Sequence, residues 1–382
     1  MLPEGWERKT VADICILQNG NGFKPHQWDT KGLPIIRIQN LNGSSNFNYF
    51  SGNPLEKWLV NPGQILFAWA GSKGVSFGPF IWNGPQGVLN QHIFKVFSKD
   101  KIDNNWLYLI LRSITDKIEG QAHGFKATLV HVKKQDIDNQ IVNIPPLPEQ
   151  KKIAAILSTW DRAIEGTEKL LANSQQQKKA LMQQLLTGKK RLPGFTGEWK
   201  HTSLKSCCAC LDNKRVPLNS DERQEMSGDI PYWGANAVVD HINKYIFNET
   251  IVLIAEDGGY FSEYRDRPIA QISYGKSWVN NHAHILTAKS EICIDEWVYY
   301  CLVHKDITAF VNGGTRAKLN KEHMLQIKIP LPDIKEQREL VSVLSTADEE
   351  ITALESDLLR LRQEKKALMQ QLLTGKRRVT VD

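Results

Sequence analysis

The chain of 382 residues contains no apolar run of the ~18 to 20 residues that a membrane-spanning helix needs. No charged and apolar leader with a small-residue end stands at its start. It has six cysteines, and their spacing fits neither a disulfide framework nor a zinc site, so we expect buried thiols and no metal. We therefore expect a soluble, cytoplasmic protein with no membrane partner. The net charge of +6 permits nucleic-acid binding without proving it.

Catalytic motifs are also missing from the sequence. An amino-methyltransferase needs a Gly-rich cofactor turn after a strand and an Asn- or Asp-Pro-Pro-aromatic segment, but here Pro145-Pro146 stands between Ile144 and Leu147. The relaxed phosphate-loop pattern at 270–277 is followed by a stretch without helical periodicity, whereas a true phosphate loop opens a helix. His282 and His284 would share a strand face, which permits a metal, although hydrogen-bonding histidines are the favoured interpretation. We predict no catalytic residue.

What the chain does have is an internal repeat. The 12 residues 178–189 recur word for word at 365–376, an offset of 187. The same offset holds without a gap back to Glu149 and Glu336, and 22 of the 41 aligned positions are identical. The stretches before each copy share only scattered residues. Each half therefore joins a variable module to a constant one.

The constant modules predict long helices, because apolar residues recur alternately every four and three residues, as in the seam of a coiled coil. Pro148 fits the first turn of the first helix, and Gly188 and Gly375 fit left-handed stop positions. Polar Ser174 and Lys178 near the middle of the seam are candidates for setting register. The first helix leads into the second variable module and the second helix returns, so we expect an antiparallel pair. The predicted seam residues are Leu157, Ile164, Leu171, Leu181, Leu185, Leu344, Ile351, Leu358, Leu368 and Leu372.

The sequence thus predicts an α+β fold with a pseudo-two-fold internal repeat. Two mixed α/β modules would be separated by two long helices that form an antiparallel coiled coil. The first module, called reader 1 below, is placed at 1–144 and the second, reader 2, at 192–329. The helical spacers are placed at 145–191 and 330–382. A dimerisation stalk with two unrelated surface domains is the alternative, but identical duplication favours matched roles.

Polar, amide-rich segments between strand-like apolar runs are the candidates for contact with nucleic acid. Asn and Gln can bridge an adenine edge, and Lys or Arg can bridge guanine or hold a phosphate. The same residues are common in ordinary turns, so composition alone leaves both interpretations open. Lys126 and Arg316 occupy matching places near the end of each reader, where we expect phosphate contacts. The candidate residues are Arg37, Gln39, Asn40, Ser72, Lys73, Asn90, Gln91, His92, Lys126, Tyr232, Trp233, Asn236, Asn280, Asn281, His282, Arg316 and Lys318.

The order of variable module, Pro-rich lead-in ending in Glu-Gln, long helix and Leu-Leu-Thr-Gly-Lys exit, then all of it again, resembles the DNA specificity subunit of a Type I restriction-modification system. The resemblance covers essentially the whole chain. It implies that each variable module is a target recognition domain for one half of a split, asymmetric sequence in double-stranded DNA, with the helices as a ruler. Lys335 stands where the first copy has Pro148, so the start of the second helix is less sharply defined.

The resemblance also implies partners. Two methyltransferase subunits would modify adenine N6 with S-adenosylmethionine, and restriction subunits would use ATP and Mg²⁺, while this chain itself would hold no cofactor. Two other functions remain open. A free-standing DNA-binding regulator would leave the helix exteriors without a purpose, and an intrinsic DNA methyltransferase would lack its motif. We expect a non-catalytic DNA-reading scaffold with two equivalent partner sites.

Overall fold

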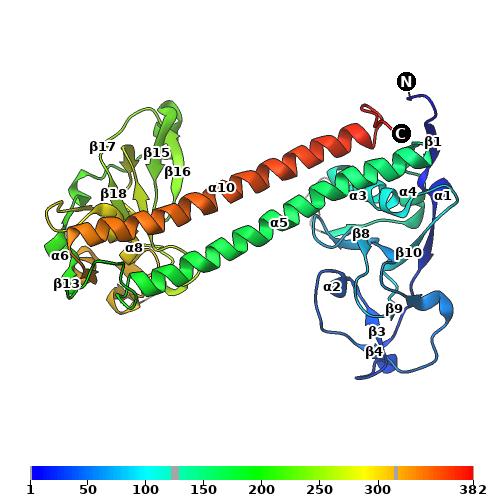
Figure 1. Cartoon of the computed structure of the whole chain (residues 1–382), viewed down its shortest axis with the longest axis horizontal. Coiled ribbons are helices and arrows are strands. Elements are labelled where there is room, and N and C mark those ends of the chain that lie inside the picture. The colour runs from blue at the N-terminus through cyan, green and yellow to red at the C-terminus, as the bar shows by residue number, and fades with distance from the viewer. Residues whose placement is uncertain (1, 122–128, 314–316, 382) are drawn as a thin grey trace. The chain divides into compact units, whose positions relative to one another are not determined.

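The computed structural model describes residues 2–121, 129–313 and 317–381. The chain divides into two compact units (Figure 1). Unit 1 comprises Met1–Glu168 and Asp357–Asp382, and unit 2 comprises Lys169–Ser356. Each unit therefore contains one reader, the beginning of one long helix and the end of the other.

Reader 1 is built on an antiparallel sheet with the order β2-β10-β6-β8. The long helix α3 packs on one face through Trp106, Leu107 and Ile110, and a smaller sheet, β4-β3-β9-β5, packs near the other. The elements are β1 Glu7–Thr10, α1 Val11–Ile14, β2 Cys15–Asn19, η1 Pro25–Gln27, β3 Leu33–Ile36, α2 Ile38–Leu41, β4 Tyr49–Phe50, η2 Glu56–Trp58, β5 Leu59–Val60, β6 Ile65–Ala68, β7 Ala70–Ser72, β8 Gly78–Ile81, β9 Gly87–Leu89, β10 Ile93–Ser98, α3 Asn104–Gln121, β11 Leu129–His131, α4 Lys134–Asp138 and β12 Ile141–Ile144.

Reader 2 repeats this plan with the sheet order β14-β21-β18-β19 and a second sheet, β16-β15-β20-β17. Trp297 of α8 is fully buried in its core. The elements are β13 Lys200–Ser203, α6 Leu204–Cys207, β14 Cys208–Cys210, η3 Asp212–Lys214, α7 Ser220–Glu225, β15 Ser227–Trp233, β16 Val238–Ile242, β17 Phe247–Asn248, β18 Ile251–Ala255, η4 Phe261–Glu263, β19 Ala270–Ser273, β20 Lys276–Val279, β21 Ala283–Ala288, α8 Asp295–Leu302, η5 Thr308–Phe310, β22 Val311–Asn312, β23 Lys318–Leu319, α9 Lys321–Gln326 and β24 Lys328–Leu331.

The two readers share one backbone frame. In each, a parallel strand pair, β3 with β9 or β15 with β20, is followed by a main-chain hydrogen bond that joins the two strand ends. Two further main-chain bonds tie the next loop to the central sheet. The matched bonds are Asn90 N to Ile36 O and Asn280 N to Trp233 O (both 3.0 Å), Trp69 N to His92 O (3.2 Å) and Glu256 N to His282 O (2.8 Å), and Val132 N to Trp69 O (3.0 Å) and Leu319 N to Glu256 O (2.8 Å).

The two long helices are α5, Leu147–Leu185, and α10, Ile334–Leu372, with 39 residues each. Helix α10 has a defined start although Lys335 replaces the proline of the first copy. The Asp333 carboxylate accepts hydrogen bonds from the N–H groups of Lys335 at 2.9 Å and Glu336 at 3.0 Å, which caps the first turn. The predicted stop residues are confirmed, because Gly188 and Gly375 have φ values of +68° and +77°.

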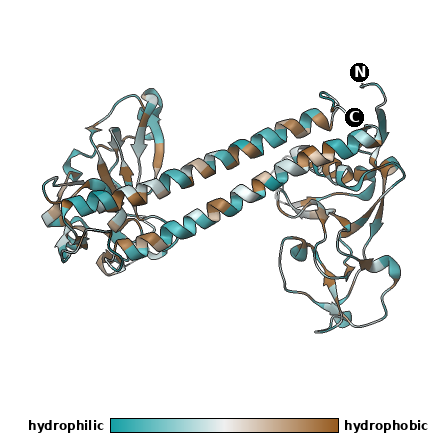
Figure 2. Cartoon of the chain, viewed as in Figure 1, coloured by the Kyte–Doolittle hydropathy of each residue, from teal (hydrophilic) through white to brown (hydrophobic). Residues whose placement is uncertain are grey.

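Segments of α5 and α10 lie side by side and antiparallel within each unit, and apolar and polar residues alternate around both helices (Figure 2). The seam residues are less exposed than most of their neighbours on the same helix. Those that are buried are Leu157, Leu185, Leu344, Leu358 and Leu372, and those that are half-buried are Ile164, Leu171, Leu181, Ile351 and Leu368.

Each unit contains one lysine–aspartate pair between its helix segments. Lys365 pairs with Asp161 in unit 1, and Lys178 pairs with Asp348 in unit 2. The lysine side chains are only 7% and 18% exposed. The two pairs are related by the repeat offset, since both members shift by 187. A charge that is mostly removed from water is stable only opposite its partner, so each pair favours one axial register of the helices.

In each unit, the first turn of one long helix is fastened to the reader and to the segment that follows the other helix. In unit 1, Glu149 accepts a hydrogen bond from Trp6 Nε1 at 3.1 Å and pairs with Arg378. In unit 2, the Glu336 carboxylate accepts bonds from Trp199 Nε1 at 2.9 Å and from Arg191 Nε at 2.6 Å. The corresponding members are Glu149 and Glu336, Trp6 and Trp199, and Arg378 and Arg191. Both glutamate residues are buried, so the sequence segment Glu-Gln is a packing element of the junction.

Over residues 2–121, 129–313 and 317–381, no helix is long and apolar enough to cross a membrane. In the same part of the chain, no group of three or more His, Cys, Asp or Glu side chains could hold a metal ion. Five of the six cysteines are buried and Cys210 is half-buried, and all six are free thiols. Burial raises the pKa of the Cys15 thiol to about 12, which keeps it protonated at neutral pH.

Candidate nucleic-acid interface

Four of the reader 1 candidates line one cavity. Arg37, Gln39, Asn90 and His92 surround a space of about 160 Å³, together with Ile38 and Ile93. The parallel pairing of β3 with β9 explains why, because Ile36 lies opposite Leu89 and both chains leave the sheet at the same edge. The residues that follow, on α2 and on the loop into β10, therefore meet at this edge.

Several polar atoms at this cavity have no hydrogen-bond partner. Arg37 Nε and His92 Nδ1 are buried without a partner among the described residues, as is Nε1 of the neighbouring Trp69. The Trp69 ring lies 5.0 Å from the His92 ring and 4.9 Å from the His131 ring, between centroids. Gln91 Nε2 lies 3.2 Å from His92 Nε2. If the amide donates, His92 carries its proton on Nδ1, so all three unpartnered atoms are donors.

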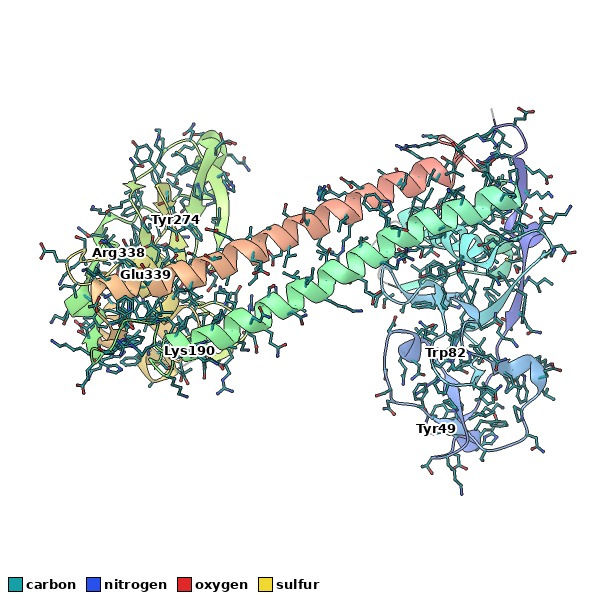
Figure 3. The ribbon with its side chains drawn as sticks, in the orientation of Figure 1. Tyr49, Trp82, Lys190, Tyr274, Arg338 and Glu339 are labelled. Carbon is teal, nitrogen blue, oxygen red and sulfur yellow. The ribbon has the colours of Figure 1, made fainter. Side chains whose placement is uncertain are left out.

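One of the residues that line the cavity, Arg37, lies beside an aromatic ring. The guanidinium carbon of Arg37 lies 5.3 Å from the Trp28 ring, at cation–π distance. Trp28 is fixed in turn by a hydrogen bond from its Nε1 to the Phe23 carbonyl oxygen at 3.2 Å. Further along the same small domain, the Phe47 ring lies 6.4 Å from both Tyr49 and Trp82, which Figure 3 labels. Arg37 is therefore held beside one aromatic ring, whose position is fixed by its own hydrogen bond.

The other reader 1 candidates have different surroundings. Lys73 and Gln91 are exposed, and Ser72 has its backbone N–H bonded to Ser76 Oγ at 2.7 Å. Asn40 is only 5% exposed, and its amide donates to the carbonyl oxygens of residues 44 and 46, both at 3.0 Å. Its polar group holds the loop together and is not offered to a ligand, which corrects its assignment as a contact residue. Lys126 lies outside the described residues.

In reader 2 the matching positions are joined by ion pairs. Asn280, Asn281 and His282 take the places of Asn90, Gln91 and His92, and Glu256 takes the place of Trp69. Nitrogen–oxygen distances are 2.6 Å for the ion pair of Arg215 with Glu256, 3.0 Å for that of Lys318 with Glu256, and 2.8 Å for the hydrogen bond between His282 Nδ1 and Asp257 Oδ1. The predicted hydrogen-bonding role of His282 is confirmed. Glu256 of reader 2 is thus paired with two cations, whereas Trp69 Nε1 at the equivalent position of reader 1 has no partner among the described residues.

A buried pair lies behind this network. His284 Nδ1 is 2.6 Å from Asp212 Oδ2, and its Nε2 is 2.7 Å from the Leu319 carbonyl oxygen. Burial pushes the pKa of Asp212 upward, but hydrogen bonds from His284 and from the Ile285 N–H outweigh it, so the pKa lies below its usual value. The pKa of Glu256 is also lowered, because bonds from Arg215 and Lys318 outweigh its desolvation. Both carboxylates are therefore charged at neutral pH.

The remaining reader 2 candidates differ in their exposure and in whether their side chains already have hydrogen-bond partners. Tyr232 is 1% exposed and its hydroxyl accepts from the Leu218 N–H at 2.9 Å, so it is a core residue and its assignment as a contact is corrected. Trp233 Nε1 donates to Ser273 Oγ at 3.0 Å, and Asn236 Nδ2 donates to the Gly258 carbonyl oxygen at 2.9 Å. Asn280 Oδ1 accepts from the His282 N–H at 2.8 Å, Asn281 is exposed, and Arg316 lies outside the described residues.

Sequence analysis missed the residues that distinguish the two readers. Trp69, Arg215, Glu256 and Asp257 belong to no amide-rich segment, and Trp28 stands alone in its stretch. One signal was available, since Trp69 and Glu256 differ by 187, the offset of the helix repeat. If the same offset is applied to the readers, Trp69 and Glu256 fall at one structural position, although their side chains differ in kind.

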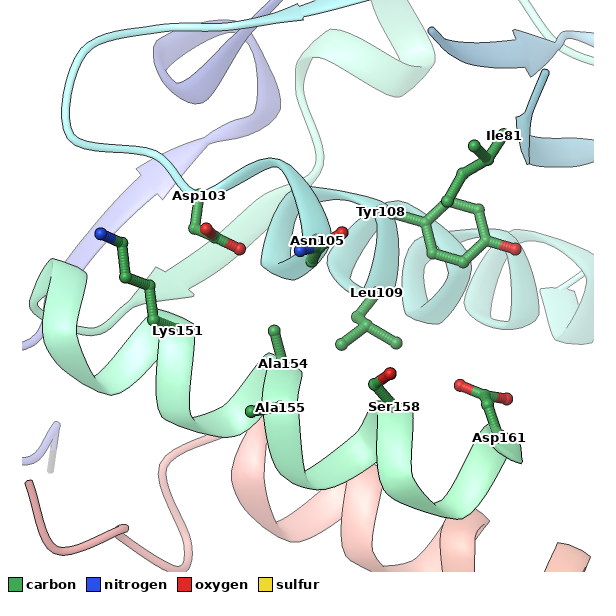
Figure 4. A pocket seen from close by; sticks show the side chains of 10 residues that line it. All are labelled: Ile81, Asp103, Asn105, Tyr108, Leu109, Lys151, Ala154, Ala155, Ser158 and Asp161. Carbon is green, nitrogen blue, oxygen red and sulfur yellow. The ribbon is translucent and has the colours of Figure 1, made fainter. Parts of the chain in front are cut away.

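A second surface lies between α3 and the start of α5 in unit 1 (Figure 4). It is a groove of about 340 Å³. Both polar and apolar side chains line it. The residues that line it are Ile81, Asp103, Asn105, Tyr108, Leu109, Lys151, Ala154, Ala155, Ser158 and Asp161.

The corresponding surface of unit 2 is formed by α8 and the start of α10. Tyr300 stands where α3 has Leu109, and its hydroxyl donates to Asp348 Oδ2 at 2.7 Å. The larger side chain thus reaches across space that stays open beside Leu109. Arg338 and Glu339 are exposed on the first turns of α10 (Figure 3). The two surfaces have matching elements but different shapes.

Known proteins resemble this chain over both halves. A family model described as the Type I restriction modification DNA specificity domain matches residues 3–173 and 196–361. The type I restriction enzyme MjaVIII specificity subunit of Methanocaldococcus jannaschii is 26% identical over 421 residues, which covers 99% of this chain and 94% of that protein. A protein of Haemophilus influenzae named as a type I restriction enzyme specificity subunit is 36% identical over 168 residues, 44% of this chain and 40% of that protein.

The fold is similar to a solved structure as well. The crystal structure of the Type-I restriction-modification system S subunit from M. genitalium superposes with a TM-score of 0.64 at 18% identity and covers 96% of both chains. That likeness concerns the fold, whereas the family match concerns the sequence of each half. Two readers on one frame, two matched helices and two copies of the same family domain agree with one another. The chain belongs to the family of Type I restriction-modification DNA specificity subunits.

Proposed function

We propose that this chain is the non-catalytic DNA-reading subunit of a Type I complex, in which each reader binds one half of a bipartite, asymmetric target in double-stranded DNA. The supporting observation is the shared backbone frame with unlike side chains at equivalent positions, Trp69 in reader 1 and Glu256 in reader 2. A common frame would dock both readers on the duplex in the same way. Different donors and acceptors at the same place would select different bases.

The helices would serve as the scaffold for partner subunits. Two methyltransferase subunits would dock on the surfaces formed by corresponding elements, one on α3 and α5 and one on α8 and α10, and restriction subunits would join them. S-adenosylmethionine, ATP and Mg²⁺ would bind to those partners. The pairs Lys365–Asp161 and Lys178–Asp348 would hold the helices in one register and so fix the gap between the half-sites.

The first experiment separates reading from catalysis. The purified chain alone should transfer no methyl group to DNA and should hydrolyse no ATP. Expressed together with its methyltransferase subunit, in cells without other adenine methylation, it should produce methylated adenines in a two-part motif with a fixed gap. The methyltransferase subunit expressed alone is the control and should leave the DNA unmethylated. Methyl transfer by the isolated chain, or a contiguous motif, would contradict the proposal.

A further inference from the structure

The cavity in reader 1 has buried nitrogen atoms without a partner among the described residues, of which Arg37 Nε is a donor and His92 Nδ1 is a donor when the Gln91 amide donates to His92 Nε2. Both atoms belong to residues that line the space of about 160 Å³. A buried N–H group that lacks an acceptor is costly, so a cluster of them in a native fold calls for an explanation. A ligand that brings acceptors into the cavity would supply one.

The shape of the cavity restricts that ligand. Arg37 is held near the Trp28 ring at 5.3 Å, and the walls of Ile38 and Ile93 are apolar. A guanidinium held in one plane presents a rigid fork that matches two adjacent acceptors. In the major groove, only guanine shows two acceptors side by side, O6 and N7. A phosphate also offers acceptors, but it would be reached equally well by exposed lysines such as Lys73, without an apolar and aromatic frame.

The matching place in reader 2 lacks this feature. Gly234 follows Trp233 where Arg37 follows Ile36, so no arginine stands at the strand end. Glu256, in the place of Trp69, is neutralised by Arg215 and Lys318. Because the frame is shared and the donors are not, the cavity is a property of reader 1 and not of the fold.

We propose that the cavity of Arg37, Asn90 and His92 reads a guanine, so that the half-site of reader 1 contains a G·C pair at one fixed position. Arg37 donates to the guanine O6 and N7 atoms. The inference rests on the proposed function, because it requires that reader 1 faces a major groove.

The test uses the full chain with its methyltransferase subunit and maps methylated sites for wild type, Arg37→Lys and Arg37→Ala. The wild-type motif should contain a G·C pair in the reader 1 half. In Arg37→Ala, which removes the fork, discrimination at that pair should fall by about 5- to 100-fold, with every other position unchanged, and Arg37→Lys should show a smaller loss because a lysine can still reach one acceptor. Arg8→Ala, which removes an exposed arginine of the same reader from strand β1, is the matched control and should keep the wild-type motif.

A binding measurement on the wild-type complex needs no variant. Replacing the guanine by 7-deazaguanine removes the N7 acceptor, so the affinity of the wild-type complex should fall, while the affinity of Arg37→Ala, already without the fork, should fall little further. A phosphate role would appear differently. Arg37→Lys would then behave as wild type, and Arg37→Ala would weaken all sequences alike and lower the salt slope by about one unit.

The phosphate outcome, or a reader 1 half-site without any G·C pair, would overturn the guanine assignment while leaving the proposed function intact. Failure of the proposed function has another signature. The wild-type chain with its partner would then give no methylation, or a motif without two halves, and both proposals would fall together.

Discussion

Reader 1 and reader 2 share three main-chain hydrogen bonds, but the polar side chains near these bonds are paired in reader 2 and partly unpaired in reader 1. In reader 2, Glu256 is paired with Arg215 and Lys318, and Asp212 with His284. In reader 1, Arg37 and His92 keep buried donors without partners among the described residues. The same backbone arrangement can therefore hold either paired charged side chains, as in reader 2, or a cavity lined by unpartnered polar atoms, as in reader 1. If each reader binds DNA as proposed, we expect base preference to change without any change in the backbone frame.

A single substitution should lower stability most in the network of paired charged side chains in reader 2. Asp212→Asn removes the carboxylate from His284, whose side chain is 2% exposed, and should lower the free energy of unfolding of reader 2 by about 3–5 kcal/mol. Denaturant unfolding followed by the fluorescence of the reader 2 tryptophans measures the loss. Asp266→Asn, at a side chain that is 86% exposed, is the control and should change little. An equal effect of both substitutions would mean that the buried pair does not stabilise reader 2.

The helix pairs should respond alike in both units, which confines the contrast to the readers. Lys365→Met removes the lysine from Asp161, and Lys178→Met leaves Asp348 with the Tyr300 hydroxyl alone, and each should cost about 1–3 kcal/mol. The nearby exposed residues Lys366 and Lys179 provide controls when changed to Met. Hydrogen exchange of the helix amides localises the effect to one unit at a time. If only one of the two substitutions increased exchange, the units would not be held by equivalent pairs.

The smallest expected effect is on acid stability. The folded-state pKa values of Asp212 and Glu256 lie below their ordinary values of 3.8 and 4.5, so these groups stabilise reader 2 above that range. The contribution is lost as pH falls below about 4.5, when protons enter carboxylates that the folded state keeps charged. Reader 1 has lowered pKa values at Asp13 and Asp29, but the main cause is hydrogen bonds from the neighbouring Thr10 and Thr30, so protonating these groups loosens local turns and no contact between distant elements. Acid titrations at high salt should therefore destabilise reader 2 first; the reverse order would contradict the comparison.

The two long helices were predictable because residues close together in the sequence determine them. Seven-residue periodicity, glycine stops and an ungapped repeat set the extent of α5 and α10, and polar Lys178 was expected to set register. Its partner, Asp348, lies 170 residues away, and no local pattern points to it. The Glu-Gln segment was visible as a motif, but its contact with Trp6 emerged only from the fold.

The readers were predictable at the level of segments and not of side chains. Arg37, Asn90 and His92 were selected for their residue type, and the parallel pairing of β3 with β9 brings them together. Asn40 and Tyr232 were selected on the same grounds and are buried, because packing decides whether a polar group is free. Glu256 was missed because its role depends on Arg215, 41 residues away in the chain.

The most direct test of the account exchanges one reader. Residues 1–144 are replaced by the first module of another family member, the chain is expressed with its methyltransferase subunit, and methylated adenines are mapped by sequencing. We expect one half of the motif to change, the other half and the gap to stay the same, and the G·C pair assigned to Arg37 to disappear unless the new module carries its own. If both halves changed together, or if the motif did not change at all, the readers would not be independent and the central claim would be wrong.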